Sequence, residues 1–186
     1  NGMKLRGFFQ DYSVAQDFIE TFTVEPLTLK SESAALKGFL SRVSDTSTLA
    51  IHMRRGDYLK YKDSFGVLSD EYYKDAMSEI SKKIEFEKVL VFTDSPELVK
   101  NFCAKMALPT EIVTSENLST SENLILMSNC RGLVTSNSTY SFWAAMLSKG
   151  TEVITPTPWF KSSDPWLNSS RLNNPVWLTA NSQWMS

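Results

Sequence analysis

Short apolar runs alternate with amphipathic segments over most of the chain. The runs occupy residues 49–53, 88–94, 111–114, 132–136 and 152–155, and the second is apolar on both faces between its charged ends, as a central parallel strand is. The segments between them repeat apolar side chains at helical spacing over residues 69–84, from 95 onward, 121–130 and 139–149. Strands that alternate with helices in this way predict right-handed βαβ units. The pattern therefore predicts an α/β fold, a doubly wound parallel sheet of about five strands.

Both ends of the chain differ from this alternating core. Two amphipathic helices precede the first strand, one over 11–22 that Pro26 ends and one that Ser31 caps. From Pro156 onward the proline, asparagine and tryptophan content predicts an irregular tail that wraps back over the core. We expect one structural domain with three parts: a leading helical segment (1–48), a core of alternating strands and helices (49–160) and the tail (161–186).

The helix predicted over 139–149 is apolar almost all round, because it contains Tyr140, Phe142, Trp143 and Met146. Helices of this kind are covered on every side. We expect the tail to cover its outer face, or a partner domain outside this chain.

Composition narrows the class of protein. The 186 residues carry a net charge of −2, which argues against a nucleic-acid partner because such a surface is basic. Cys103 and Cys130 lie in apolar helical patterns, which favours reduced thiols over a disulfide framework. Because the sequence has neither a signal peptide nor an apolar run of membrane-spanning length, we expect a cytoplasmic protein, at most peripheral at a membrane.

The most polar cluster of the chain follows the first predicted strand. It contains the only histidine, His52, two arginines, Arg54 and Arg55, and Asp57. In an open parallel sheet, ligands bind at the carboxyl ends of the strands. A guanidinium group pairs with phosphate oxygens through two parallel hydrogen bonds. This cluster therefore predicts a phosphate-binding loop.

A second anion site is predicted where the fourth strand passes into the apolar helix, at Asn137, Ser138 and Thr139. Backbone N–H groups and the positive end of the helix dipole point toward the sheet edge there. Together with the arginine loop, this site would hold a diphosphate from two sides. The sequence contains no glycine-rich dinucleotide or P-loop motif and no spaced metal ligands. We therefore expect group transfer that needs neither cofactor nor metal, with arginine and the helix dipole stabilising the departing diphosphate.

At these residues the sequence resembles a known family. The segment His52-Met-Arg-Arg-Gly-Asp-Tyr58 looks like the signature of the bacterial α-1,2-fucosyltransferases of glycosyltransferase family 11. The resemblance runs from about Gly7 to Phe160 through ordered blocks at Leu68–Tyr73, Val91–Asp94, Leu126–Cys130, Asn137–Trp143 and Pro158–Phe160. It implies that residues 49–160 are the Rossmann-like, donor-nucleotide-binding core of the C-terminal domain of a GT-B enzyme. Such an enzyme inverts stereochemistry and uses GDP-fucose without metal, in polysaccharide or oligosaccharide synthesis.

The resemblance also implies roles for individual residues. Arg54 and Arg55 would bind the diphosphate, Arg55 being the more critical, and His52 would line the same pocket. Ser138 and Thr139 would complete the phosphate grip, and Asp94 would shape the nucleoside side.

Two departures from the family pattern matter. The acid that usually reads the guanine edge is replaced by Asn123, which follows Glu122; an amide offers one acceptor oxygen where a carboxylate offers two. The family's N-terminal, acceptor-binding domain is missing, so we expect a C-terminal fragment that binds donor weakly and transfers poorly. Asp57, Asp63 and a group of the missing domain are candidates for the general base, and Asp57 is slightly favoured among them.

The leading hypothesis is thus the donor domain of a fucosyltransferase that acts on a galactoside-type acceptor. Two alternatives stay open. One is a non-catalytic module that binds sugar nucleotides, and the other is an interaction domain that uses the apolar helix around Trp143.

Overall fold

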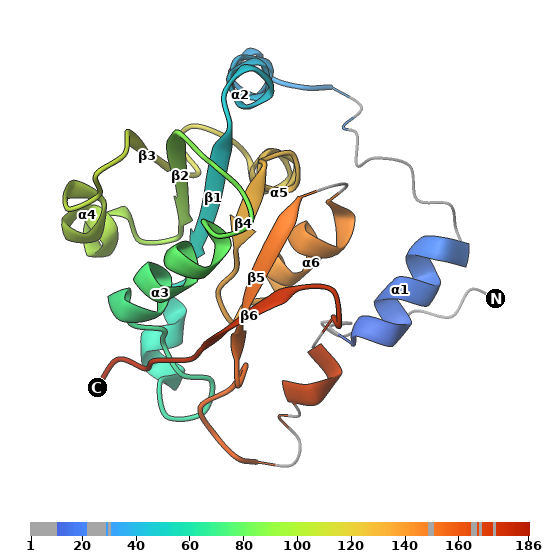
Figure 1. The fold of residues 1–186 in the computed structure, drawn as a ribbon, viewed down its shortest axis with the longest axis vertical. Coiled ribbons are helices and arrows are strands. Elements are labelled where there is room, and N and C mark those ends of the chain that lie inside the picture. The colour runs from blue at the N-terminus through green and yellow to red at the C-terminus, as the bar shows by residue number, and fades with distance from the viewer. Residues whose placement is uncertain are drawn as a thin grey trace.

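The computed structural model describes residues 11–21, 29, 31–148, 151–164, 167, 169–172 and 174–186. Within these residues, six parallel strands form one sheet in the order β3-β2-β1-β4-β5-β6 (Figure 1). The strands are β1 (Thr48–Met53), β2 (Lys88–Thr93), β3 (Thr110–Val113), β4 (Gly132–Val134), β5 (Glu152–Thr157) and β6 (Leu178–Asn181). Strand order reverses between β1 and β4, so the connections that follow these two strands diverge there and leave space at the carboxyl edge.

The helices are α1 (Tyr12–Thr21), α2 (Ala34–Asp45), α3 (Asp70–Ile80), α4 (Pro96–Ala104), α5 (Thr120–Ser128) and α6 (Thr139–Leu147), with short 3-10 helices η1 (Asp57–Tyr61) and η2 (Ser169–Leu172). Helices α3 and α4 cover one face of the sheet, and α2, α5 and α6 cover the other. The predicted doubly wound α/β fold is confirmed.

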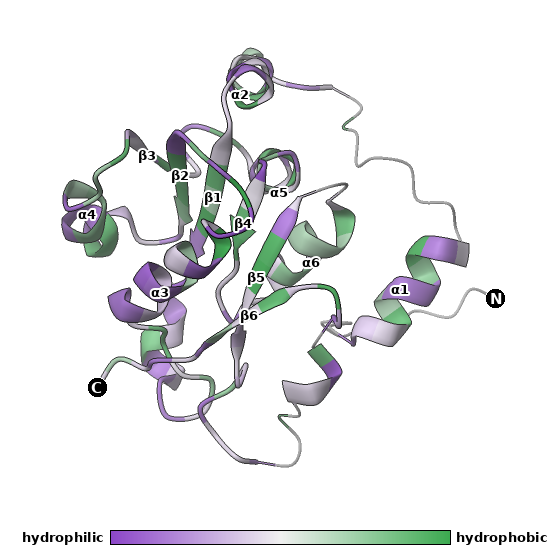
Figure 2. Ribbon diagram, in the orientation of Figure 1, coloured by the Kyte–Doolittle hydropathy of each residue, from purple (hydrophilic) through white to green (hydrophobic). Residues whose placement is uncertain are grey.

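The two faces of β1 are buried in different clusters because side chains alternate along a strand. Leu49, Ile51 and Met53 pack against α3 and α4, whereas Ala50 packs against α2, α5 and α6. All six residues of β1 are buried, which explains the apolar run in the sequence. Figure 2 shows hydrophobic residues along the central strands and hydrophilic residues on the outer turns of the helices.

The structure differs from the predicted elements mainly in the tail. Residues 178–181 form β6, a sixth parallel strand beside β5, where the sequence predicted irregular chain. Only one of its four residues is buried, so the strand does not need an apolar run, and its sequence contains none. At the other end, Ser33 rather than Ser31 caps α2, accepting a hydrogen bond from Leu36 N at 3.0 Å. The predictions that involve residues 7–10, Phe22, Pro26 and Gly150 lie outside the described residues.

The apolar helix α6 is covered by the chain itself. Phe142 is fully buried, and its ring lies 6.3 Å from that of Trp159, just after β5, and 5.9 Å from that of Trp177 in the tail. Ala15 and Ile19 of α1 belong to the same cluster. The tail was one of the two predicted covers, the other being a partner domain outside this chain, and the interaction-domain alternative loses the unpartnered helix on which it depended.

Candidate functional site

A cavity of about 1020 Å³ opens at the carboxyl edge of the sheet. Residues at or just beyond the ends of β1, β2 and β3 line it, together with the N-terminal ends of α5 and α6. Seven predicted site residues meet there: His52, Arg54, Asp57, Asp94, Asn123, Ser138 and Thr139. The structure thus brings the arginine loop and the start of α6 to one cavity, as β1 and β4 are neighbours.

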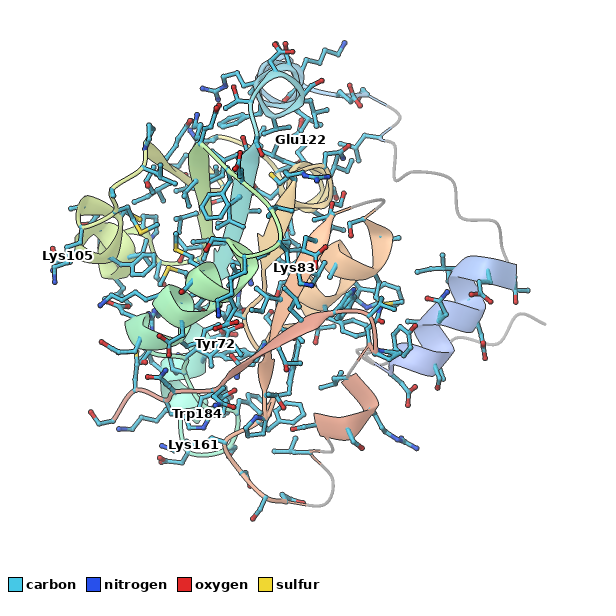
Figure 3. All side chains as sticks on the ribbon, in the orientation of Figure 1. Tyr72, Lys83, Lys105, Glu122, Lys161 and Trp184 are labelled. Atoms are coloured by element: carbon cyan, nitrogen blue, oxygen red, sulfur yellow. The ribbon has the colours of Figure 1, made fainter. Side chains whose placement is uncertain are left out.

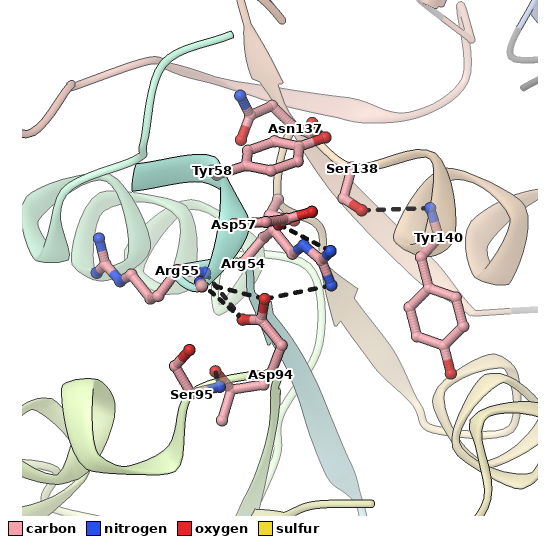
Figure 4. Close-up of polar contacts among 12 residues, drawn as sticks. Arg54, Arg55, Asp57, Tyr58, Asp94, Ser95, Asn137, Ser138 and Tyr140 are labelled. Carbon is pink, nitrogen blue, oxygen red and sulfur yellow. Dashed lines mark hydrogen bonds and ion pairs between the residues drawn. The ribbon is translucent and has the colours of Figure 1, made fainter. Parts of the chain in front are cut away.

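Arg54 lies in the wall of this cavity between two carboxylates. Its Nη2 is 2.8 Å from Asp57 Oδ1 and its Nη1 is 3.3 Å from Asp94 Oδ2 (Figure 4). The guanidinium carbon lies 5.6 Å from the centre of the Tyr58 ring. The two ion pairs hold the guanidinium in place, and the side chain, which is 29% exposed, lines the cavity.

Arg55 does not reach the cavity, which is a correction to the predicted pair of phosphate-binding arginines. Its side chain points away from Arg54, toward α3, and the residue is 2% exposed. Its Nη2 pairs with Asp70 Oδ1 at 2.7 Å, and its Nη1 donates to the carbonyl of Leu68. Because side chains alternate along an extended chain, two successive arginines leave β1 on opposite sides.

Asp94 fixes the loop that carries both arginines. Its carboxylate accepts hydrogen bonds from the backbone N–H of Arg55 at 3.0 Å and of Gly56 at 3.1 Å. A Cβ atom on Gly56 would lie 2.6 Å from Asp94 Oδ2, so the close approach requires glycine there. Asp94 therefore shapes the loop after β1 directly, in addition to lining the cavity.

The N-terminus of α6 borders the cavity opposite Arg54. Ser138 is its N-cap and accepts a hydrogen bond from Tyr140 N at 3.3 Å. Asn137 is placed differently: its Nδ2 donates to the carbonyls of Phe65, at 2.9 Å, and Gly66, at 3.1 Å. Asn137 thus braces the loop after η1, while Ser138 and Thr139 line the cavity.

His52 contributes an uncharged ring to the site. It is 3% exposed, and its Nδ1 lies 2.8 Å from Ser136 Oγ. Burial lowers the pKa of His52 to about 4, with Arg54 acting in the same direction. The imidazole is therefore neutral at physiological pH, and Arg54 supplies the positive charge on this side of the cavity.

Glu122 and Asn123 have different roles at the start of α5: Glu122 caps helices, and Asn123 lines the cavity. The Glu122 carboxylate accepts hydrogen bonds from the backbone N–H groups of Ser33 and Ser119, at 3.0 and 2.9 Å, and its pKa is lowered to about 2 by the bonds to these serines. Glu122 is therefore a cap that ties α2 to α5. Asn123 lines the cavity; its Nδ2 donates to Leu118 O, and its buried Oδ1 has no partner among the described residues.

The two ends of the cavity differ in chemistry. One end has Asn123, Thr114 and Glu116, and the other is aromatic, with Tyr58, Tyr61, Phe65 and Phe160. The Phe65 ring lies 5.6 Å from that of Tyr58 and 6.1 Å from that of Phe160. We define these four side chains as the aromatic end. Sequence reasoning gave no site role to them or to Glu116, although Tyr58 and Phe160 stand in the quoted motif blocks and Glu116 follows the third strand.

Two further observations concern ligands and membranes. Among the described residues, no group of three or more His, Cys, Asp or Glu side chains is placed to hold a metal ion. In the same residues, no helix has the length and apolar character needed to cross a bilayer.

The sequence was compared with protein families and with individual proteins. Residues 5–178 match the family described as Glycosyl transferase family 11. The O-antigen biosynthesis glycosyltransferase WbnK of Escherichia coli is 28% identical over 96% of this chain and 61% of its own length. The alpha-1,2-colitosyltransferase of Escherichia coli is 30% identical over 67% of this chain and 44% of its own length. The chain thus spans about half of these relatives.

Solved structures share the fold at low sequence identity. POFUT1 in complex with GDP superposes with a TM-score of 0.53 and 13% identity, over 77% of this chain and 49% of that one. A glycosyl transferase family 9 protein from Veillonella parvula DSM 2008 gives a TM-score of 0.51 and 12% identity, over 91% of this chain and 47% of that one. These likenesses establish a shared Rossmann-like fold.

Proposed function

The chain belongs to glycosyltransferase family 11, and on that premise we propose that its cavity binds GDP-fucose as the donor of a fucosyl transfer. One observation carries the proposal: Arg54 and the N-terminus of α6 border the same cavity from adjacent strands. A diphosphate between them would meet a guanidinium fork on one side and a helix dipole on the other. Similar proteins support the choice of ligand, since one is a colitosyltransferase and another binds GDP.

The donor is proposed to lie along the cavity with its base toward Asn123. The unpartnered Oδ1 of Asn123 would accept one N–H of guanine, and the nearby Glu116 carboxylate offers a second acceptor. The sugar would then reach the aromatic end, where rings of Tyr58 and Phe65 suit the apolar face of a 6-deoxyhexose. Arg54, rather than Arg55, is the arginine proposed to hold the diphosphate.

The proposed chemistry is an inverting transfer. An acceptor hydroxyl, of galactoside type, attacks C1 of fucose while the bond from C1 to the diphosphate oxygen breaks. Negative charge develops on the leaving diphosphate, where Arg54 and the α6 N-terminus would stabilise it without a metal. Asp57 is proposed to take the hydroxyl proton, because its carboxylate lines the cavity, whereas Asp63 does not.

Calorimetry tests the donor site. We expect GDP to bind at least about tenfold more tightly than UDP or ADP, with or without EDTA, and Arg54→Met to weaken GDP by about 10- to 100-fold through the loss of charge-assisted hydrogen bonds. Arg42→Met is the matched control, because Arg42 pairs with Glu111 at the surface away from the cavity. Equal affinity for the three nucleotides, unchanged in Arg54→Met, would reject the donor site.

A second measurement separates the enzyme from a non-catalytic module that only binds sugar nucleotides. Release of GDP from GDP-fucose would be followed in the presence of a β-galactoside. Asp57→Asn should lower this rate by about 10²- to 10⁴-fold if Asp57 is the general base, and Asp63→Asn should not. The decisive protein is one as long as the family relatives, with this chain as its C-terminal part. If such a protein binds GDP-fucose without transferring fucose, the binding-module alternative is favoured.

A further inference from the structure

A segment close to Ser186 pairs with the stretch of chain that leads into α3. Residues 183–185 run antiparallel to residues 67–69, and we call them the strap. Ser69 N donates to Gln183 O at 2.7 Å, and Met185 N donates to Val67 O at 2.8 Å. Leu68 and Trp184 form the bridge between these two bonds. The sequence predicted no paired structure here.

Arg55 ties the strap to the phosphate loop. Its Nη1 contacts both the carbonyl of Leu68 and the sulfur of Met185, one from each of the two paired segments. Its Nη2 pairs with Asp70 at the start of α3. A single buried guanidinium therefore holds three segments together: the end of β1, residues 68–70 and the strap.

Trp184 closes the other side of the strap. A Cβ atom on Gly66 would overlap the Trp184 ring, and Gly66 has φ of 81°, which a side chain rarely adopts. Trp184 also packs against the core beside α3 and lies close to Lys161 (Figure 3). The strap thus fits only because residue 66 has no side chain.

The strap lies next to the end of a loop whose side chains line the cavity. Residues 57–66 run from the phosphate loop to residues 67–69, which pair with the strap. They carry Tyr58, Tyr61 and Phe65 of the aromatic end. The carbonyl of Phe65 accepts hydrogen bonds from Asn137 Nδ2 at 2.9 Å and Lys161 N at 3.2 Å. The far end of the loop is therefore fixed by Asn137 and Lys161 and by the adjoining strap.

We propose that Arg55 is a positioning residue that holds the strap against residues 67–69 and thereby fixes the aromatic end, which receives the sugar. The inference rests on the proposed function, because it assumes that the cavity takes a sugar nucleotide. Besides Arg55, the strap is held by its two backbone bonds, by the packing of Trp184 and by a bond from Gln183 Nε2 to Asp75 Oδ2 at 2.5 Å, and Met185 is 38% exposed. Segments with few buried contacts open at a lower cost than the whole domain, so loss of Arg55 should loosen the strap in a folded protein.

The experiment compares ligands that reach different distances along the cavity. Dissociation constants of GMP, GDP and GDP-fucose would be measured by calorimetry on wild type and Arg55→Met, below the unfolding transition of each. We expect Arg55→Met to weaken GDP-fucose by about two- to thirtyfold, the range of couplings through intervening residues, and to leave GMP unchanged. A general loss of structure would weaken all three ligands together.

Gly66→Ala provides an independent variant with Arg55 intact. The added methyl group displaces Trp184, so the same selective loss of GDP-fucose affinity is expected. The double variant should be no weaker than the worse single one, because both changes open one strap. Arg42→Met controls for the loss of an arginine. If Arg55→Met fails to fold, Gly66→Ala alone tests the role of the strap.

Two outcomes would overturn the inference. If Arg55→Met weakens GDP and GDP-fucose equally, and does so additively with Gly66→Ala, Arg55 acts on the diphosphate directly. If neither variant changes the GDP-fucose to GMP ratio while wild type binds both, the strap has no role in the site. Failure of wild type to bind any of the three ligands would reject the proposed function itself.

Discussion

Two neighbouring regions of the phosphate loop use the same side chain in opposite ways. On the α6 side, Arg54 is 29% exposed in the cavity wall, between Asp57 and Asp94. On the α3 side, Arg55 is 2% exposed and pairs with Asp70, which is itself half-exposed. Arg54 can turn its charge toward a ligand, whereas the contacts of Arg55 are all made within the protein.

The contrast follows from the geometry of β1. Even-numbered positions, Ala50 and His52, face the α5 and α6 side, and odd-numbered positions, Ile51 and Met53, face α3. The alternation continues past the end of the strand, so Arg54 follows His52 into the cavity and Arg55 follows Met53 into the core. Adjacent residues of one motif can therefore bind ligand and hold the fold, respectively.

Of the two arginines, the buried Arg55 is expected to contribute more to the free energy of unfolding. Arg55→Met leaves the buried carbonyl of Leu68 without its donor and Asp70 without its partner. An unsatisfied buried acceptor costs about 1–3 kcal/mol, so urea unfolding should show a loss of about 2 kcal/mol. Arg54→Met should lose less than about 1 kcal/mol, since partly exposed ion pairs contribute little. Equal losses in the two variants would contradict the division between them.

The second prediction tests the neutral histidine beside Arg54. Burial holds the pKa of His52 at about 4, below its ordinary value of 6.5. Between these values the unfolded chain binds the proton and the folded protein does not, so stability is fully present above pH 6.5 and falls as the pH drops toward 4. The slope should approach about 1.4 kcal/mol per pH unit.

His52→Gln should flatten this part of the curve. Unfolding by urea, measured from pH 7 to pH 4, is the appropriate experiment. Glu122, whose pKa is lowered to about 2, adds its own loss below pH 4.5 in both proteins and serves as an internal reference. Identical slopes between pH 6.5 and 4.5 would show that His52 is not the group that titrates.

Much of the fold could be predicted because buried parallel strands leave a strong pattern. The central strands β1 and β2 are apolar on both faces, and their helices begin at recognisable residues such as Pro96. The strand β6 could not be found in this way, because it lies at the edge, with a single buried residue. Its pairing depends on β5 and on packing rather than on its own sequence.

The site was predictable as a place and less so in its contacts. Topology brings the ends of β1 and β4 together, so His52, Arg54 and Ser138 share one cavity. The alternation of side chains along an extended chain could have predicted that Arg54 and Arg55 point to opposite sides. The interpretation of the motif as a pair of phosphate-binding arginines did not take it into account. The contact between Arg55 and Met185 was not, since it joins residues that are 130 positions apart.

The smallest expected effect concerns the charge that faces Arg54. Asp57 Oδ1 lies 2.8 Å from Arg54 Nη2 and is half-exposed, so its carboxylate competes with a phosphate for the guanidinium. Asp57→Asn removes this competition, and the worth of an exposed pair, about 0–1 kcal/mol, predicts GDP binding that is up to about fivefold tighter. Asp63→Asn is the control, because Asp63 is exposed and lies outside the cavity lining. Calorimetry at two salt concentrations would check the cause, since screening should shrink the gain. Weaker binding in Asp57→Asn would mean that the carboxylate orients Arg54 for the ligand instead of competing with it.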